Sequence, residues 1–208
     1  FFQHPDGQNI LVFGPSHYCA QLEASKVLAK NIMTQLNIPT AQYQVLTDYA
    51  EAWNYAIQKQ STPEKLIPCV VKASGLALGK GAYVCQSMSE VQTALHNIMV
   101  DKVHGSAGNE VIIEEFLVGQ EISVLAFCDG KTVRLCPTVQ DHKQLLNGDL
   151  GQMTGGMGAI TPVSWIASET LEDIRQHIIQ PIIDYFTAQG NPYKGCLYAG
   201  LMITKDGP

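Results

Sequence analysis

Alternation of apolar and polar residues divides the chain into short strands and amphipathic helices. Ser89 with Gln92 fits a capping box before one helical segment, and we expect Pro181 to kink the last helix and Gly190 to end it. Apolar residues at helical spacing predict helices at 20–36, 47–60, 91–99 and 168–190. Apolar runs predict strands at 10–16, 40–47, 66–74, 81–86, 110–116, 121–128, 131–137 and 196–204.

The segment 137–163 breaks this pattern, because it is polar, rich in glycine and without clear periodicity. A loop of that length inside a compact domain is usually functional or disordered, so we expect it to carry part of a site. Elsewhere strands and helices are mixed, and many neighbouring strands look like hairpins rather than βαβ units. This arrangement predicts the α+β fold class.

Composition narrows the classes of function. Of the 208 residues, 46% are hydrophobic and 15% charged, which is typical of a globular protein with a substantial core. The formal net charge of −6, with 13 lysines and arginines, argues against a nucleic-acid partner. No run approaches the ~20 apolar residues of a membrane span, and the first residues do not resemble a signal peptide. We therefore expect no membrane partner. The six cysteines form no C-x-x-C pair, so we expect free thiols and a cytoplasmic location.

The stretch GLALGKG at residues 75–81 has two competing interpretations. Glycine allows close backbone approach and lets several N–H groups point at one anion, so the loop could cradle phosphate. It matches neither a Walker A loop nor a Rossmann motif, because Gly81 follows Lys80 and a strand-like segment comes next. It could equally be a plain strand connector. Lys72 favours phosphate, since a lysine at the end of an apolar strand needs an anionic partner.

The stretch VIIEEFLVGQE also has two interpretations. It could be a strand that exposes Glu114 and Glu115, with Glu114 serving only as a salt-bridge partner, for instance of Lys72. Alternatively it could seat a nucleotide. Backbone groups of Glu115 and Leu117 would then bond the adenine edge, and Glu121 would accept hydrogen bonds from ribose hydroxyls.

Taken in order, five motifs resemble the ATP-grasp superfamily: LEASK with Lys26, VVKASGLALGKG with Lys72, EEFLVGQE, QDHK and TGGMGA. The finer resemblance is to the phosphoribosylamine–glycine ligase family, and it runs from about residue 10 to residue 208. QDHK followed by TGGMGA is its most specific part. The resemblance implies an ATP-grasp fold with two α+β subdomains, nucleotide between them, and a chain truncated at both ends.

The implied activity is that of an ATP-dependent ligase of de novo purine biosynthesis. It would join glycine to 5-phosphoribosylamine through a glycyl phosphate, giving glycinamide ribonucleotide, ADP and phosphate. The resemblance implies ATP and Mg²⁺ or Mn²⁺ as cofactors, and these small molecules as the partners. The expected metal ligands lie beyond Pro208, so none is assigned in this chain. Two alternatives stay open, another ATP-grasp carboxylate–amine ligase and a non-catalytic ATP-binding module.

The resemblance also implies roles for particular residues. Catalytic roles would fall to Lys72, Asp141, His142 and Lys143. ATP binding would use Lys26, Lys72, Gly75, Gly79, Lys80, Gly81, Glu114, Glu115, Phe116, Leu117 and Glu121. The side that accepts phosphoribosylamine and glycine would use Asp141, His142, Lys143, Asp149, Thr154, Gly155, Gly156, Met157 and Gly158.

The resemblance divides the chain as well. Residues 1–20 would end an N-terminal mononucleotide-like domain, and 66–128 would form the lid subdomain with the glycine-rich loop. Residues 21–65 and 129–208 would be two parts of the central domain, the second carrying the substrate loop. Departures from the family pattern at Gln144, Gln152 and Met153 leave the choice of acceptor open. A further departure, Leu78, lies in the glycine-rich loop.

Overall fold

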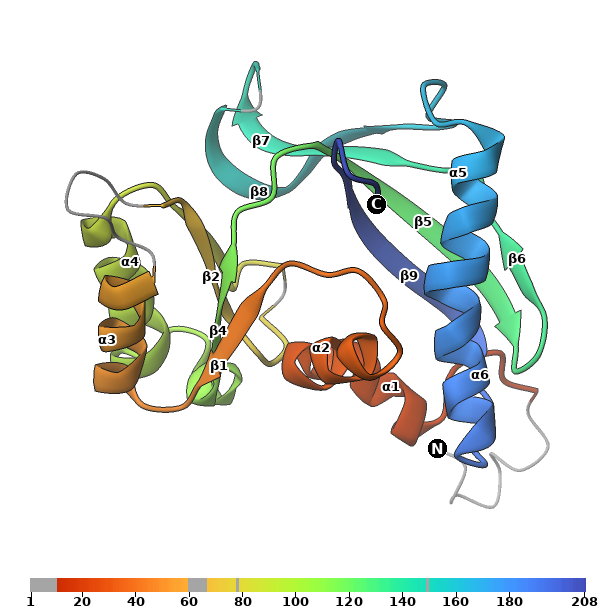
Figure 1. Ribbon diagram of the computed structural model, residues 1–208, viewed down its shortest axis with the longest axis horizontal. Coiled ribbons are helices and arrows are strands. Elements are labelled where there is room, and N and C mark those ends of the chain that lie inside the picture. The colour runs from red at the N-terminus through yellow and green to blue at the C-terminus, as the bar shows by residue number, and fades with distance from the viewer. Residues whose placement is uncertain (1–10, 60–66, 78, 149) are drawn as a thin grey trace.

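The structure, a computed structural model, describes residues 11–59, 67–77, 79–148 and 150–208 and has two lobes (Figure 1). The first lobe is a four-stranded sheet, and the second is a three-stranded sheet beside a long helix. A two-stranded hairpin extends from the second lobe. These separate antiparallel sheets confirm the predicted α+β class. Leu78, Asp149 and the side chains of Gln152 and Met153 lie outside the described residues.

The sheet of the first lobe presents one apolar face and one face with charged residues. Its helices are α3 (Tyr49–Lys59) and α4 (Met88–Leu95), followed by a π-helical turn η2 (His96–Val100) and a 3₁₀ helix η3 (Gly105–Asn109). Side chains alternate along a strand, so Val71 and Ile113 enter the core under α3 and α4, where both are fully buried. Lys72 and Glu114 therefore point to the opposite face. The strands are antiparallel, in the order β1 (Tyr43–Leu46), β4 (Val111–Glu115), β2 (Cys69–Ala73) and β3 (Ala82–Cys85).

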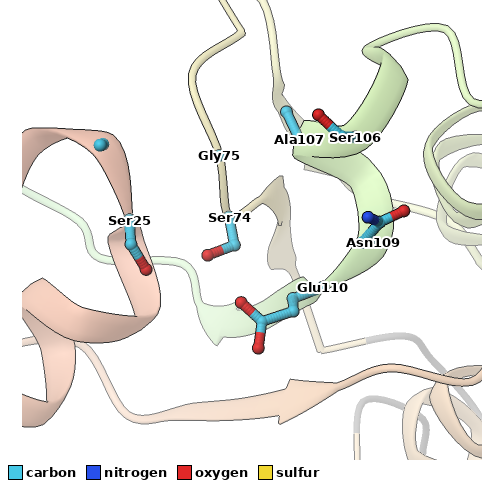
Figure 2. A pocket seen from close by; sticks show the side chains of 8 residues that line it. Ser25, Ser74, Gly75, Ser106, Ala107, Asn109 and Glu110 are labelled. Carbon is cyan, nitrogen blue, oxygen red and sulfur yellow. The ribbon is translucent and has the colours of Figure 1, made fainter. Parts of the chain in front are cut away.

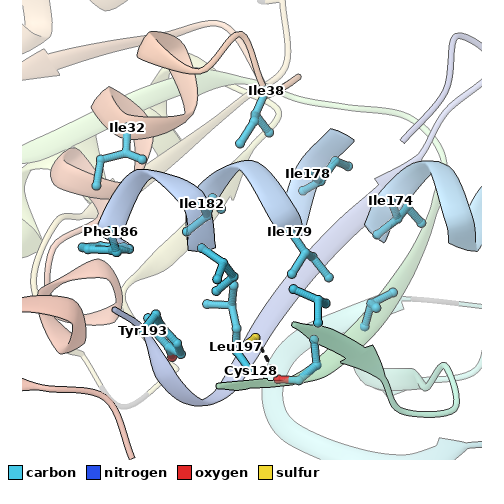
Figure 3. Close-up of a cluster of buried hydrophobic side chains, with 14 of the residues drawn as sticks. Ile32, Ile38, Cys128, Ile174, Ile178, Ile179, Ile182, Phe186, Tyr193 and Leu197 are labelled. Atoms are coloured by element: carbon cyan, nitrogen blue, oxygen red, sulfur yellow. Dashed lines mark hydrogen bonds between the residues drawn. The ribbon is translucent and has the colours of Figure 1, made fainter. Parts of the chain in front are cut away.

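The second lobe has its own core under the long helix. Figure 3 shows Phe186 and Ile179 from that helix, with Ile32 from an N-terminal helix, gathered into this core. Burying one large apolar side chain stabilises the fold by roughly 2–3 kcal/mol. The sheet order is β6 (Val133–Leu135), β5 (Gln120–Asp129) and β9 (Lys194–Ile203). The helices are α1 (His17–Ala24), α2 (Lys26–Gln35), α5 (Ser168–Asp173), the π-helical η4 (Ile174–Ile179) and α6 (Gln180–Ala188).

The hairpin of β7 (Gln140–Leu146) and β8 (Leu150–Ile160) replaces most of the loop predicted at 137–163. The prediction was wrong because side chains of β7 are half-buried or exposed along its whole length. No face of β7 enters a core, so its sequence shows none of the apolar alternation by which strands are recognised.

Two predicted elements at the N-terminal end also differ. Residues 11–16 form no strand, and the helix predicted at 20–36 is two helices separated at Ser25. Ser25 has extended dihedrals (φ −135°, ψ 110°), and its hydroxyl accepts a hydrogen bond of 3.1 Å from the N–H of Leu28. A serine side chain that caps the next helix competes with continued helical winding.

Helix boundaries elsewhere agree in part with the predictions. The capping box belongs to Ser87 and Glu90 rather than to Ser89 and Gln92, because Ser87 has the extended backbone that a cap needs. Helical winding continues past Pro181, with a π-helical segment immediately before it. The helix ends before Gly190, which has a φ of +71°, as predicted.

Strand pairing differs from the expected grouping of residues at two places. β1 and α3, expected in the central domain, belong with the first-lobe sheet and its core. β5, expected in the lid, belongs to the second-lobe sheet. The chain therefore crosses between the lobes before β1 and again between β4 and β5, at residues 116–119 (Figure 1).

Candidate active site

Glu114 lies at the centre of a cluster of lysines on the charged face of the first-lobe sheet. Only 5% of this residue is exposed, and its two carboxylate oxygens face different lysines. Oε1 pairs with Lys72, and Oε2 lies 2.8 Å from the Lys30 ammonium. Burial alone would raise the pKa of the Glu114 carboxyl, but the charges of Lys72 and Lys30 outweigh burial and lower that pKa. Glu114 is thus the buried counterion of two lysines. One of our two interpretations had it as a salt-bridge partner of Lys72, but it expected an exposed carboxylate and did not include Lys30.

Lys30 is a member of this cluster that the sequence reasoning missed. Its ammonium donates to Thr40 Oγ1 (2.7 Å) and to the carbonyl of Ala41 (3.3 Å), and it lies 5.1 Å from the centre of the Tyr43 ring. The signal in the sequence was its spacing. Lys30 follows Lys26 by four residues, and residues four apart share one face of a helix.

Lys26 joins the cluster to the glycine-rich loop. Its ammonium donates to the carbonyl oxygens of Ala73 (2.9 Å) and Gly75 (3.1 Å). Burial, and then the nearby charge of Lys72, lower the pKa of Lys26. Lys30 and Lys72 therefore pair with the carboxylate of Glu114, and Lys26 lies within reach of its charge and that of Lys72. Such an excess of cations with an exposed member is an anion-binding arrangement, and the Lys72 side chain is 29% exposed.

Packing and backbone geometry account for each glycine of the loop. A Cβ on Gly75 would lie 2.6 Å from Ala107 Cα, and one on Gly81 would lie 2.6 Å from Ala77 Cβ. Gly79 has a φ of +76°, which favours glycine. Lys80 is exposed beside it, and its backbone N–H closes a turn to Ala77. Larger residues would strain this loop at each of the three positions, whether or not it also contacts phosphate.

A pocket of about 340 Å³ lies at Gly75, between the α1–α2 junction and η3 (Figure 2). Apart from Gly75, none of the residues expected to bind ATP lines it, so it is distinct from the lysine cluster. The residues that line it are Ala24, Ser25, Ser74, Gly75, Ser106, Ala107, Asn109 and Glu110.

Within the described residues, the segment from Glu114 to Leu117 has backbone N–H groups without a hydrogen-bond partner at Phe116 and Leu117. The Glu115 N–H donates to the carbonyl of Gln42 (2.9 Å), and the Glu115 carboxylate accepts from the Gln42 N–H (2.9 Å). The Glu115 N–H is therefore occupied. The N–H of Leu117 forms no hydrogen bond with the described residues, and the side chain of Phe116 next to it is exposed.

A second charged cluster lies at the start of β5, seven residues beyond Glu114 in the chain. Lys143 pairs with Glu121 and lies 3.8 Å from Asp141 Oδ2. Burial would lower the pKa of Lys143, but the hydrogen bond and charge of Glu121 outweigh burial and raise it. Glu121 and Lys143, assigned to different substrates, are thus direct neighbours.

Ser123 and Tyr198 border this second cluster and were also missed. Ser123 follows Glu121 on the same face of β5, is buried, and lies 3.2 Å from the Tyr198 hydroxyl. Gly200 pairs with Ser123, and a Cβ there would approach the Tyr198 hydroxyl to 2.9 Å. Their signal was weak, because a serine and a tyrosine in apolar strands are normally read as packing residues.

Residues of the TGGMGA motif on β8 form hydrogen bonds with β7 beside the second cluster. Thr154 Oγ1 donates to the carbonyl of Lys143 (2.9 Å) and accepts from the N–H of Gly156 (3.0 Å). Gly156 has a φ of +127°, and a Cβ there would lie 3.1 Å from Asp141 Oδ1. The structure thus brings Thr154 and Gly156 close to Lys143 and Asp141, respectively.

The remaining acceptor-side residues are less enclosed. Gly155, Met157 and Gly158 are exposed. His142 is exposed as well, and it forms no hydrogen bond or ion pair within the described part of the chain. Gln144, a departure from the family pattern, has a buried Oε1 without a hydrogen-bond partner among the described residues.

No group of three or more histidine, cysteine, aspartate or glutamate residues that could hold a metal ion occurs within the described ranges. The carboxylates of both clusters are already paired with lysines. These residues therefore do not fit a divalent cation. Over the same ranges, no helix is long and apolar enough to cross a membrane.

Comparison with known proteins gives this geometry a context. Residues 24–208 match the family described as phosphoribosylglycinamide synthetase, ATP-grasp (A) domain. A phosphoribosylamine–glycine ligase of Leptospira interrogans is 47% identical over 199 residues, which cover 96% of this chain and 45% of that protein. The human trifunctional purine biosynthetic protein adenosine-3 is 45% identical over 196 residues, which cover 94% of this chain and 19% of that protein.

A solved structure agrees with the sequence matches. The crystal structure of phosphoribosylamine–glycine ligase from Thermotoga maritima has a TM-score of 0.84 at 36% identity, covering 100% of this chain and 50% of that one. This chain thus spans about half the length of its single-function relatives. The expected ATP-grasp fold is confirmed, and the chain belongs to the phosphoribosylglycinamide synthetase family, of which it carries the ATP-grasp (A) domain.

Proposed function

We propose that the protein carrying this chain is an ATP-dependent ligase that joins glycine to 5-phosphoribosylamine. The observation that carries the proposal is a group of three lysines at the base of a glycine-rich loop, two of them paired with the buried carboxylate of Glu114 and the third bonded to Gly75. Family membership supplies the reaction class. The products would be glycinamide ribonucleotide, ADP and phosphate.

The lysine cluster would bind the nucleotide phosphates. Lys72 is partly exposed, and Lys26 is bonded to the first residues of the loop, so both can lie beside a triphosphate under that loop. Gly79, Lys80 and Gly81 would cover it. The free N–H of Leu117 would bond the adenine edge, whereas the occupied N–H of Glu115 would not. A cation close to a transferring phosphoryl group stabilises the charge that develops on it.

The second cluster would hold the acceptor and the ribose. Glu121 and Asp141 can accept hydrogen bonds from the hydroxyl and amine groups of these ligands, Lys143 holds both carboxylates in place, and the backbone of Thr154–Gly158 lies beside them. In the reaction, a glycine carboxylate oxygen takes the γ-phosphoryl group of ATP and ADP leaves. The amine of phosphoribosylamine then attacks the carbonyl carbon, the new C–N bond forms, and phosphate leaves with that oxygen. The protein supplies positioning and exclusion of water.

Mg²⁺ or Mn²⁺ belongs to the proposal only as a companion of the nucleotide phosphates, because the described residues offer no ligand set and no step depends on one. The free cysteines, four of them buried, fit a reducing cytoplasmic location, which we also propose.

The test is ADP release by the intact protein, with ATP, Mg²⁺, glycine and phosphoribosylamine supplied together and then omitted one at a time. We expect ADP only with the complete mixture, a loss of at least tenfold in Lys72→Ala, and little change in the matched control Lys102→Ala. ADP that forms equally well without glycine refutes the proposal. Activity with a different amine would instead indicate another carboxylate–amine ligase.

A further inference from the structure

We propose that Lys30 is a positioning residue of the phosphate site, which neutralises Glu114 so that Lys72 keeps a charge to offer the nucleotide. This inference rests on the proposed function, and it deepens the role of the lysine cluster. Lys30 is only 8% exposed, whereas the side chain of Lys72 is 29% exposed. Lys72 is therefore the lysine that can contact a ligand directly.

The surroundings of Lys30 leave no room for a direct role. An ammonium group has three donors. Two of them serve Thr40 Oγ1 (2.7 Å) and the carbonyl of Ala41 (3.3 Å), and the third neighbour is Glu114 Oε2 at 2.8 Å. The Tyr43 ring lies 5.1 Å away on another side. Lys30 can influence a bound phosphate only through the residues that it touches.

Lys30 acts on Lys72 through Glu114, which contacts both lysines. One carboxylate oxygen faces Lys72 and the other faces Lys30, and Oε2 receives no hydrogen bond of good geometry. The contact with Lys30 therefore depends on charge more than on direction. Without Lys30, more of the negative charge of Glu114 would act on Lys72, hold it against the sheet and weaken its attraction for phosphate.

A purely structural role for Lys30 makes a different prediction. The residue connects α2 with the segment before β1 and with β4, so its removal destabilises the fold under either interpretation. A structural role would weaken binding of every ligand alike. A positioning role would weaken binding in proportion to the number of phosphates on the ligand.

The experiment compares Kd values for ATP, AMP and adenosine in the intact protein by calorimetry. The variants are Lys30→Met, the double variant Lys30→Met/Glu114→Gln, and Lys102→Met as a control lysine on the first lobe. We expect Lys30→Met to weaken ATP binding about tenfold and adenosine binding less than about twofold. The double variant restores the charge balance of the wild type, so its Kd for ATP should return to within about threefold of the wild-type value.

Equal weakening of ATP and adenosine, or no weakening of either, would overturn the inference. If Lys30→Met does not fold, the double variant decides alone, because it buries neither ion. Selective loss of ATP binding in that double variant would show that Lys30 itself is needed. Kd values test Lys30, and glycine dependence of ADP release tests the proposed function, so either can fail separately. A wild-type protein that binds no ATP would contradict both.

Discussion

Replacing Gly75 with alanine would test whether packing against η3 sets the shape of the glycine-rich loop. The added Cβ would lie 2.6 Å from Ala107 Cα and 2.8 Å from Ala107 Cβ. Carbon atoms pack best at about 3.5–4.0 Å, so the loop and η3 would have to separate by roughly 1 Å. The hydrogen bond from the Gly75 N–H to the carbonyl of Ala107 (3.1 Å) spans the same contact and would lengthen with it.

Overpacking of this kind costs about 1–3 kcal/mol and a lost hydrogen bond about 1 kcal/mol. We therefore expect Gly75→Ala to lower the free energy of unfolding, measured by urea denaturation, by ~2–4 kcal/mol. The Kd for ATP should rise as well, because the Lys26 ammonium bonds the carbonyl of Gly75.

Gly79→Ala is the matched control for this variant. A Cβ added at Gly79 would meet nothing within 4 Å, and the φ there is +76°, so only the left-handed backbone conformation is penalised, at about 1–2 kcal/mol. Gly75→Ala/Ala107→Gly should recover part of the lost stability, because it removes one of the two clashing carbons. A loss below about 0.5 kcal/mol in Gly75→Ala, the range of ordinary surface substitutions, would refute the packing argument.

Three further predictions concern other parts of the molecule. Folding lowers the pKa of Glu114, so the stability that this carboxylate contributes is present above its ordinary pKa of about 4.3 and is lost as the pH falls through the lower folded value. Urea denaturation should show that Glu114→Gln costs ~3 kcal/mol at pH 7 and progressively less below pH ~4. A cost that stays the same at every pH would contradict this prediction. Phe186 is 1% exposed in the second-lobe core, so Phe186→Ala should cost ~3–5 kcal/mol in denaturant unfolding, whereas a change under about 1 kcal/mol would mean that Phe186 does not pack in this core. Tyr198→Phe removes the contact between the Tyr198 hydroxyl and Ser123 (3.2 Å). Steady-state kinetics of the intact protein should show the KM for glycine or phosphoribosylamine raised about fivefold, with the KM for ATP unchanged. A rise in the KM for ATP alone would place Tyr198 on the nucleotide side.

The sequence predicted best those elements whose residues enter a core. β2 and β4 carry fully buried apolar residues such as Val71 and Ile113, and both were predicted close to their observed bounds. The hairpin of β7 and β8 was missed because β7 is half-buried or exposed along its length and shows no apolar alternation. The break at Ser25 was missed because apolar spacing continues across it, although the serine itself was a capping signal.

The sequence predicted many of the residues that lie in the two clusters, but not which charged side chains pair with one another. The sequence allowed Glu114 to be either an exposed salt-bridge partner, for instance of Lys72, or part of a nucleotide seat, and only the structure shows that it is buried beside two lysines. Lys30 lies far from Glu114 in sequence, and a lysine in a helix is normally solvated. The proximity of Glu121 and Lys143 likewise depends on how β7 turns back towards β5, which local patterns do not encode.

The central claim is that the reaction passes through a glycyl phosphate, and the most direct test follows the carboxylate oxygen atoms of glycine. The intact protein is given glycine labelled with ¹⁸O in its carboxylate, together with ATP, Mg²⁺ and phosphoribosylamine, and the released inorganic phosphate is analysed by mass spectrometry. The account predicts one ¹⁸O atom in each phosphate released, because the glycine oxygen that accepts the phosphoryl group leaves with it, and it predicts that Lys72→Ala abolishes the labelled product. Released phosphate without ¹⁸O would contradict an acyl phosphate intermediate and, with it, the function proposed for this site.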